Sequence, residues 1–367
     1  MLLLVGWRPF RPCCFIPGRN GLSNPAHAPS FLHHRQYDPG RPGSSGPYTR
    51  PTQTNNPPPG AQALAAHGFE VRSDLAFRLL RPTPALGRRL IVAEHDGGEP
   101  DVGPEPLLSW DARPDNPFAR KIYELDGGFA VWHEGAGWFL VDPDRASIAI
   151  PPHPEELRRE ERTLGLPTAL CAIRGGDLVL HGSAVDVEGS AILFCAPGHF
   201  GKTTLAGAFL QAGHRLLSDD MSCCRLEPEP TMQPGPAVLR VRKDVFGRLE
   251  FPGTDCLVED EHKAHLVLGS SARGSGSPIP IKAIVFLREA SLRRLEGRST
   301  IYRVPAPEAL PNLWSVAFRL PKSAEPTFQK VAALAGRVPV WEMYRPTSFD
   351  GLPDVVELVV STCLPED

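Results

Sequence analysis

The stretch from Ser190 to Leu210, SAILFCAPGHFGKTTLAGAFL, constrains the fold more than any other part of the chain. The apolar run Ala191–Cys195 has the length of a buried strand, and the small apolar residues 204–212 are typical of a helix. Between them, residues 196–203 fit the phosphate-binding pattern Ala-x4-Gly-Lys-Thr, with alanine where glycine is commonest. The sequence therefore predicts a strand, an anion-binding turn and a helix in direct succession.

A turn of this kind points consecutive backbone N–H groups into one concavity, beside the positive end of the following helix. In such a turn Lys202 would carry positive charge to the β- and γ-phosphates of ATP, and Thr203 would offer a hydroxyl ligand to Mg²⁺. The residues expected to bind these cofactors are Gly198, His199, Phe200, Gly201, Lys202, Thr203 and Thr204. A structural turn without a nucleotide is the alternative interpretation.

Charge and composition exclude several classes of partner. The net charge of −3 over 367 residues argues against nucleic acid or an anionic membrane surface as the main partner. No apolar run has the length needed to span a bilayer. The eight cysteines form no Cys-x-x-Cys pair, and the neighbours Cys223 and Cys224 are poorly placed to share a metal or a disulfide. We therefore expect a cytoplasmic protein, and the oligomeric state stays open, a homo-oligomer included.

The chain divides into three regions by composition. Residues 1–60 contain twelve prolines and a single acidic residue, Asp38, so we expect a disordered tail rich in proline and glycine. Residues 61–153 hold short alternating runs separated by glycine-containing turns, which predict a small β-rich amino-terminal domain. The aromatic residues of these strands, with His133 among them, are expected to pack in its core. Residues 154–367 carry the phosphate-binding motif.

In this last region the segment 214–220 predicts a strand that ends in paired carboxylates, Asp219 and Asp220. The carboxyl ends of strands are where α/β sheets bind ligands, although a solvated turn is the alternative. His181 follows another apolar strand, where a histidine with a purely structural role is also common. Strands alternate with helices, at least one hairpin feeds the sheet, and residues 338–343 predict an edge strand. The fold class is therefore α/β with a mixed sheet.

Three segments in this order and at this spacing, His181–Val185, Gly198–Thr204 and Gly213–Asp220, resemble the carboxyl-terminal catalytic domain of HPr kinase/phosphorylase and its kinase-like relatives. The similarity is clear over about Leu166–Asp220 and weaker over Val238–Thr362. It implies a P-loop domain related to the phosphoenolpyruvate carboxykinase core. It also implies ATP-dependent phosphorylation of a serine hydroxyl on a protein.

The resemblance assigns a role to each matching residue. Lys202 and Thr203 would serve the phosphates and Mg²⁺, and Asp219 would be the acid/base at the acceptor hydroxyl. Asp220 would support the metal and the loop, and His181 would lie beside the site. The expected catalytic residues are thus Asp219, His181 and Lys202, and the expected metal ligands are Thr203 and Asp220.

Two departures from the family pattern narrow the expected activity. Val238–Lys243 stands where the bifunctional members have a glycine-rich Leu-Gly-Ile signature, which argues against phosphorylase activity. The amino-terminal region is unlike the regulatory domain of the enzyme that phosphorylates HPr, so the acceptor need not be HPr. Relatives with this layout include kinases encoded near lasso-peptide maturation genes, whose acceptor is a precursor peptide. Arg240 and Lys263 could contact phosphate or acceptor, but surface or structural charges are expected.

We therefore expect an ATP-dependent serine kinase that acts on a small protein or a precursor peptide. Two alternatives remain open. One is a kinase of a small-molecule hydroxyl, and the other is a nucleotide-binding regulator whose P-loop switches conformation without phosphorylating a substrate.

Overall fold

The computed structural model describes residues 63–84, 86–112, 118–153, 155–196, 200–259, 263–288, 298–346 and 348–365. The chain divides into two units, Met1–Pro47 and Tyr48–Asp367, and every described residue belongs to the second unit. The tail predicted over residues 1–60 lies outside the described residues. Among the described helices, none combines the length and the apolar character that crossing a membrane requires.

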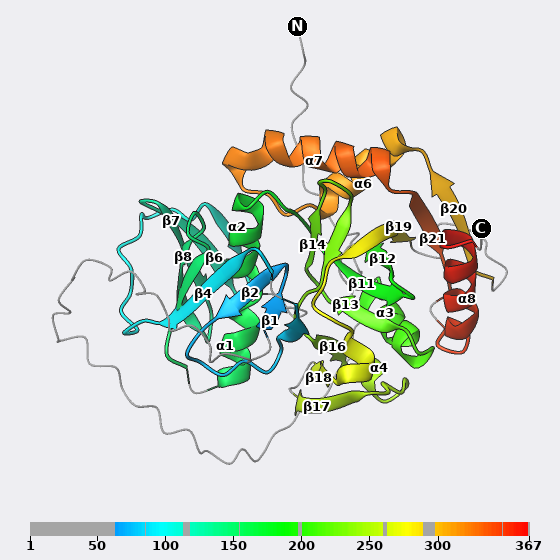
Figure 1. Ribbon diagram of the computed structural model, residues 1–367, viewed down its shortest axis with the longest axis horizontal. Coiled ribbons are helices and arrows are strands. Elements are labelled where there is room, and N and C mark those ends of the chain that lie inside the picture. The colour runs from blue at the N-terminus through cyan, green and yellow to red at the C-terminus, as the bar shows by residue number, and fades with distance from the viewer. Residues whose placement is uncertain are drawn as a thin grey trace, which may run out of the picture. The chain divides into compact units, whose positions relative to one another are not determined.

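A nine-stranded mixed sheet, which we call the amino-terminal lobe together with the two helices packed on it, occupies the first part of the described chain. Its strands lie in the order β3-β1-β2-β4-β9-β8-β7-β6-β5, coloured blue to teal in Figure 1. Their bounds are β1 Ala63–Ala66, β2 Phe69–Arg72, β3 Arg81–Thr83, β4 Arg89–Glu94, β5 Leu108–Trp110, β6 Arg120–Leu125, β7 Gly128–His133, β8 Gly137–Asp142 and β9 Ser147–Ile150. From β5 to β9 each strand is antiparallel to the next, whereas β2, β4 and β9 are mutually parallel neighbours.

Helices α1 (Glu156–Thr163) and α2 (Leu166–Arg174) pack against this sheet. Their buried residues, such as Leu170, share one hydrophobic cluster with Phe139 and Ile148 of the sheet. The boundary expected between residues 153 and 154 therefore falls between the sheet and the helices that cover it.

A second mixed sheet, which forms the carboxyl-terminal lobe with its helices, carries the predicted phosphate-binding segment. The central strand order is β20-β21-β19-β12-β11-β13, and β15, β14 and β10 continue from the first residues of β19. The bounds are β10 Leu178–Leu180, β11 Gly182–Val187, β12 Ser190–Cys195, β13 Arg215–Ser218, β14 Ser222–Arg225, β15 Thr231–Gln233, β19 Ile279–Arg288, β20 Thr300–Val304 and β21 Val340–Tyr344. The parallel pairs β12/β19 and β19/β21 beside antiparallel hairpins confirm the mixed α/β class.

One expectation about this sheet is wrong. Residues 338–343 were expected to form an edge strand, but β21 pairs with β19 on one side and with β20 on the other. Pro339 suggested the edge, yet it precedes the strand, so no hydrogen bond of the ladder is lost.

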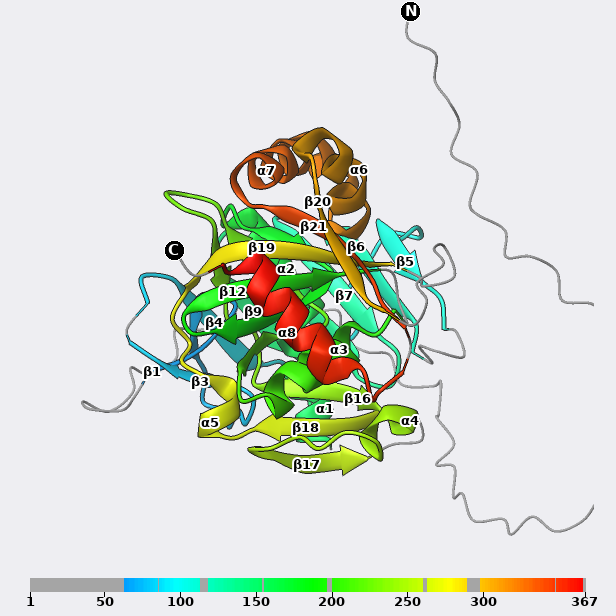
Figure 2. The ribbon, with the colours of Figure 1, turned by 90° about the vertical axis from the view of Figure 1, so that its right-hand side faces the viewer.

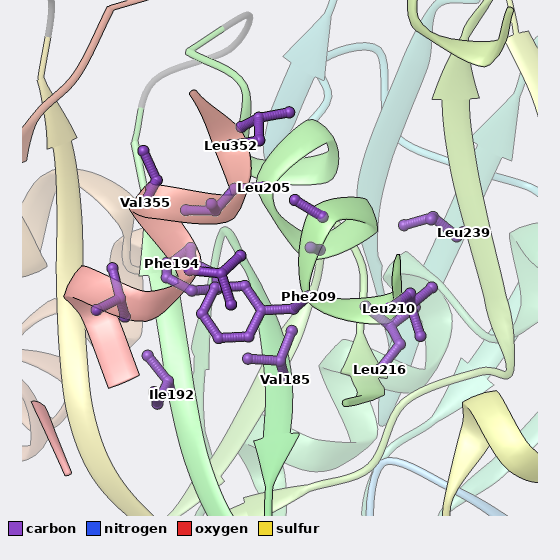
Figure 3. Packing of buried hydrophobic residues seen from close by; sticks show 14 of the residues in the cluster. Val185, Ile192, Phe194, Leu205, Phe209, Leu210, Leu216, Leu239, Leu352 and Val355 are labelled. Carbon is purple, nitrogen blue, oxygen red and sulfur yellow. The ribbon is translucent and has the colours of Figure 1, made fainter. Parts of the chain in front are cut away.

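Helices cover both faces of this sheet. On one face lie α3 (Lys202–Gln211) and α8 (Leu352–Cys363), which Figure 2 shows crossing side by side in front of the strands. On the other face lie α6 (Ala306–Val316) and α7 (Ala324–Arg337). Figure 3 shows the core under α3, where Phe209 of the helix meets Phe194 of β12 with ring centroids 5.3 Å apart. This packing fixes α3, and with it the residues at its amino-terminal end.

A small three-stranded sheet adjoins α3 and is built from β16 (Val238–Arg242), β18 (Lys263–Leu268) and β17 (Thr254–Glu259), in that order. Two short helices flank it, α4 (Lys243–Phe246) and α5 (Ser270–Arg273). Leu239 and Leu266 pack into the same core as α3. The strand β16 thereby carries Arg240 toward the end of β13.

Candidate active site

The phosphate-binding segment has the strand and the helix that the sequence predicts on either side of its turn. Strand β12 ends at Cys195, and α3 begins at Lys202. Gly201 has a φ of 80° and immediately precedes the helix. This left-handed conformation is accessible to glycine without strain. Of the predicted binding residues, Gly198 and His199 lie outside the described residues, while Phe200 and Thr204 lie on either side of the helix start.

The Lys202 side chain reaches back to the residue after β12 and is almost completely buried. Its ammonium group donates a hydrogen bond to the backbone carbonyl oxygen of Ala196 at 2.9 Å. Burial lowers the pKa of Lys202, and the carboxylates of Asp220 and Asp219 oppose that shift. The helix start therefore combines a positive side chain with the backbone N–H groups of its first turn.

Thr203 and Asp219 are in direct contact. The Thr203 hydroxyl donates to Asp219 Oδ1 at 3.0 Å, and the Ser183 hydroxyl donates to the same oxygen at 2.9 Å. The backbone N–H of Arg240 donates to the other oxygen, Oδ2, at 3.1 Å. The Asp219 side chain is only 3% exposed, so these three groups hold a buried carboxylate in one orientation.

Asp220 differs from its neighbour, because its side chain is 53% exposed. It follows β13 with a φ of 71°, a left-handed conformation that turns its side chain away from that of Asp219. His181 lies beside it, since Nδ1 of the histidine is 3.0 Å from the Asp220 backbone oxygen and 3.2 Å from Oδ1. Both oxygens can only accept, so Nδ1 carries a proton and the neutral imidazole presents Nε2 as an acceptor.

Arg240 lies between the two aspartates. Its guanidinium donates to the backbone oxygen of Asp219 at 3.1 Å and lies 3.6 Å from Asp220 Oδ2. Desolvation alone would raise the pKa of Asp220, but the charge of Arg240 holds this pKa well below its usual range. Arg240, expected as a surface or structural charge, therefore belongs to the site.

Arg345 also reaches the site, although no motif or periodic pattern in the sequence points to it. It follows the last residue of β21, and its Nη2 atom lies 2.3 Å from the position that a Cβ atom on Gly201 would occupy. Burial lowers the pKa of Arg345. A guanidinium over the glycine of the turn fits the recognition of phosphate oxygens.

The donor groups fit the cofactors that the motif predicts. Hydroxyl and carboxylate oxygens such as those of Thr203 and Asp219 are the ligands that Mg²⁺ prefers. The guanidinium of Arg345 lies beside Gly201, and the ammonium group of Lys202 lies at the helix start. Both are cations that suit phosphate. The structure thus brings Lys202, Thr203 and both aspartates to one place, with His181 beside Asp220.

Comparison with known proteins adds little to this geometry. No protein-family model matches the chain, and no curated protein matches it. Among solved structures, an HPr(Ser) kinase/phosphatase from Coxiella burnetii is similar to 50% of this chain and 94% of its own, with 13% identity and a TM-score of 0.28. A TM-score this low carries no argument about activity, so the functional case stands on the site itself.

Proposed function

We propose that the protein is an ATP-dependent phosphotransferase that phosphorylates a hydroxyl group, with a serine of a small protein or precursor peptide as the acceptor. One observation carries the proposal. The first turn of α3, which bears the Gly-Lys-Thr sequence, meets a strand end with two carboxylates, and Thr203 hydrogen-bonds directly to Asp219. A phosphate cradle, a metal-ligand pair and a second carboxylate are the groups that phosphoryl transfer to a hydroxyl requires.

The donor side of the reaction would use Lys202, Thr203, Asp219 and Arg345. Lys202 and Arg345 stabilise negative charge on the phosphates, because both are cations held at the turn by the protein. Thr203 and Asp219 are the residues that would hold Mg²⁺, which supplies neutralising charge to the β- and γ-phosphates when bound. The buried Asp219 suits this role, since three hydrogen bonds fix its oxygens.

The acceptor side would use the pair formed by Asp220 and His181. Asp220 is half-exposed, so an acceptor hydroxyl can reach it, and Arg240 keeps it ionised. With Asp220 fixing Nδ1 of His181, Nε2 is available to take the hydroxyl proton while the oxygen bonds to the γ-phosphorus and the bond to ADP breaks. The resemblance implies that Asp219 is the acid/base and that Asp220 supports the metal. In this proposal Asp219 would hold the metal instead, and Asp220 would orient the base, His181.

A second acceptor class, a small-molecule hydroxyl, is favoured by one observation. Asp219, Asp220 and His181 line a half-open cavity of about 170 Å³ rather than a flat surface. A non-catalytic regulator needs no acceptor base, so substitutions at His181 should leave such a protein functional.

The substitution Lys202→Met tests the proposal, because it keeps the buried stem and removes the charge. Calorimetry with Mg²⁺ and ATP should show weaker binding, and γ-labelled ATP should label no acceptor in a lysate of the source organism. Lys282→Met, at an exposed position of β19, is the matched control. Equal nucleotide affinity and equal labelling in wild type and Lys202→Met would refute the proposal.

A further inference from the structure

The cavity beside Asp220 is lined by both lobes. From the carboxyl-terminal lobe come Asp219, Asp220 and Arg240, and from the amino-terminal lobe come Arg120, His133 and Arg162. A larger hollow of about 620 Å³ shares His181 and Phe318 with the cavity and extends to Ala196 at the phosphate-binding turn. The cavity therefore lies next to the place where a phosphoryl group would be transferred.

The amino-terminal lobe contributes buried polar nitrogens that lack hydrogen-bond partners among the described residues. Arg120 on β6 and His133 on β7 are directly opposite one another in the sheet, and Arg162 lies in the last turn of α1. The Nε atoms of both arginines and both ring nitrogens of His133 are buried without a hydrogen bond to any residue in the described part of the chain. His133 is 2% exposed, so water cannot solvate its ring from outside. A buried polar group without a partner is costly, which makes such a cluster a candidate ligand site.

The carboxylates that line the same cavity are already engaged. Glu161 contacts His265 at 2.7 Å, and Asp219 accepts the three hydrogen bonds described above. Asp220 is held by His181 and Arg240. The donors of Arg120 and Arg162 are thus left over once the acids have been paired.

The pKa shifts of the cluster agree with the missing hydrogen-bond acceptors. Burial, followed by the charge of Arg120, lowers the pKa of Arg162 to about 10 against the opposing charge of Glu161. Burial, followed by the charges of Arg162 and Arg120, lowers the pKa of His133 well below its usual value. Glu161 and Asp220 offset part of the repulsion among Arg120, Arg162 and Arg240, and a bound anion would relieve the rest.

We propose that this cavity binds an anionic group of the acceptor, a carboxylate or a phosphate, through Arg120, Arg162 and His133. This inference rests on the proposed function and names the chemistry of its acceptor: a hydroxyl compound with an acidic group close to the hydroxyl. The volume of about 170 Å³ admits a group of a few heavy atoms and excludes a folded protein surface. A small hydroxy acid or phosphorylated alcohol fits, and so does the acidic end of a peptide, because the recognised group is the same.

Binding is tested first with inorganic phosphate in the Lys202→Met background, where the phosphate-binding turn is disabled. Calorimetry should still detect phosphate, and Arg162→Gln or Arg120→Gln should each weaken it about tenfold or more. Arg174→Gln is the control, because this arginine is exposed and pairs with Asp144. The unliganded Arg162→Gln protein should melt at the same temperature as its parent or higher, since the repulsion of Arg162 by Arg120, Arg240 and Arg158 is removed together with its attraction to Glu161. Phosphate that binds equally with and without Arg162, or does not bind at millimolar concentration, overturns the proposal.

Turnover then identifies the source of the anionic group. ADP release is compared for glycerate, glycerol 3-phosphate and glycerol, and for a serine peptide with a free or an amidated carboxyl end. We expect the anionic member of at least one pair to be phosphorylated. Arg162→Gln should raise the KM for that acceptor and leave kcat unchanged. Neutral members used as well as their anionic partners would overturn the proposal while leaving the phosphotransferase activity intact. Failure of wild type to bind Mg²⁺ and ATP would instead remove the proposed function, and phosphate binding would still be scored separately.

Discussion

Replacing each aspartate of the site by asparagine separates the two sides of the proposed reaction. In Asp219→Asn, the amide oxygen can keep the hydrogen bonds from Ser183 and Thr203 as neutral bonds, whereas the amide NH2 group cannot accept from the backbone N–H of Arg240. A hydrogen bond to a charged group contributes about 1.5–3 kcal/mol and a neutral one about 0.5–1.5 kcal/mol, so the two retained bonds lose about 2 kcal/mol together and the lost bond about 2 kcal/mol. Relief of the repulsion with Asp220 offsets part of that loss. We expect the free energy of unfolding to fall by about 3 kcal/mol.

Asp220→Asn should behave differently, because the side chain is half-exposed. Solvent screens its attraction to Arg240, so the free energy of unfolding should change by less than about 1 kcal/mol. Mg²⁺-dependent ATP affinity should be retained, whereas phosphoryl transfer should fall by roughly 10²–10⁴-fold, as it does when a positioned base or its orienting partner is lost. In Asp219→Asn the affinity for ATP should fall only when Mg²⁺ is present.

Chemical denaturation gives the stabilities, and calorimetry with a non-hydrolysable ATP analogue, with and without Mg²⁺, gives the affinities. Transfer is followed in a single turnover with labelled ATP. Asp244→Asn is the control, because this carboxylate is exposed and pairs only with Arg242 among the described residues. If Asp219→Asn keeps its Mg²⁺-dependent affinity and loses only transfer, Asp219 is the base and our distribution of roles is wrong.

Three further predictions use other parts of the site and its support. Gly201→Ala should weaken nucleotide binding by calorimetry, since a residue with a Cβ is strained at a φ of 80° and the methyl group would displace the Arg345 guanidinium; unchanged binding would contradict the cradle. Arg345→Gln should weaken ATP binding by roughly 10–100-fold without changing AMP binding, and an equal effect on both would show that Arg345 is structural. His67 has a folded pKa of about 4 against about 6.5 unfolded, so the unfolded chain binds more protons between these values and stability is lost as the pH falls through this window. At pH 5 that loss is about 2 kcal/mol relative to pH 7.5, and His67→Asn should remove it from denaturation curves. A pH dependence that is unchanged in His67→Asn would contradict this assignment.

The sequence predicts the part of the site that local chemistry decides. A buried strand, a glycine-containing turn and a helix in direct succession follow from residues within one short segment. The carboxylates at the end of β13 were also predictable, because strand ends in α/β sheets collect ligand-binding residues. The roles of Asp219 and Asp220 were not, since their different burial depends on the backbone turn at Asp220 and on Arg240 from another strand.

The remaining site residues come from distant parts of the chain. Arg345 reaches Gly201 only because β21 is the inner neighbour of β19, which periodicity could not show. Arg120 and Arg162 look like ordinary surface charges in the sequence, and His133 looks like a core aromatic residue. An arginine and a histidine on two strands and an arginine on a helix carry no local signal, and only the packing of the two lobes brings these side chains to one cavity.

The amino-terminal lobe is anchored by buried hydrogen bonds to the strand that precedes Asp219. Arg81 of β3 is completely buried and donates to the carbonyl oxygens of Gly235 at 2.6 Å and Leu217 at 3.2 Å. Leu217 lies in β13, two residues before Asp219, so a buried cation from one lobe fixes the strand that carries the carboxylate of the other. The backbone N–H of His67 adds a hydrogen bond to Pro234 at 2.7 Å. Because the lobe that holds Arg120 and His133 is anchored this closely to β13, the distance between an anion in the cavity and Asp220 is set by the fold, which is what positioning a hydroxyl for transfer requires.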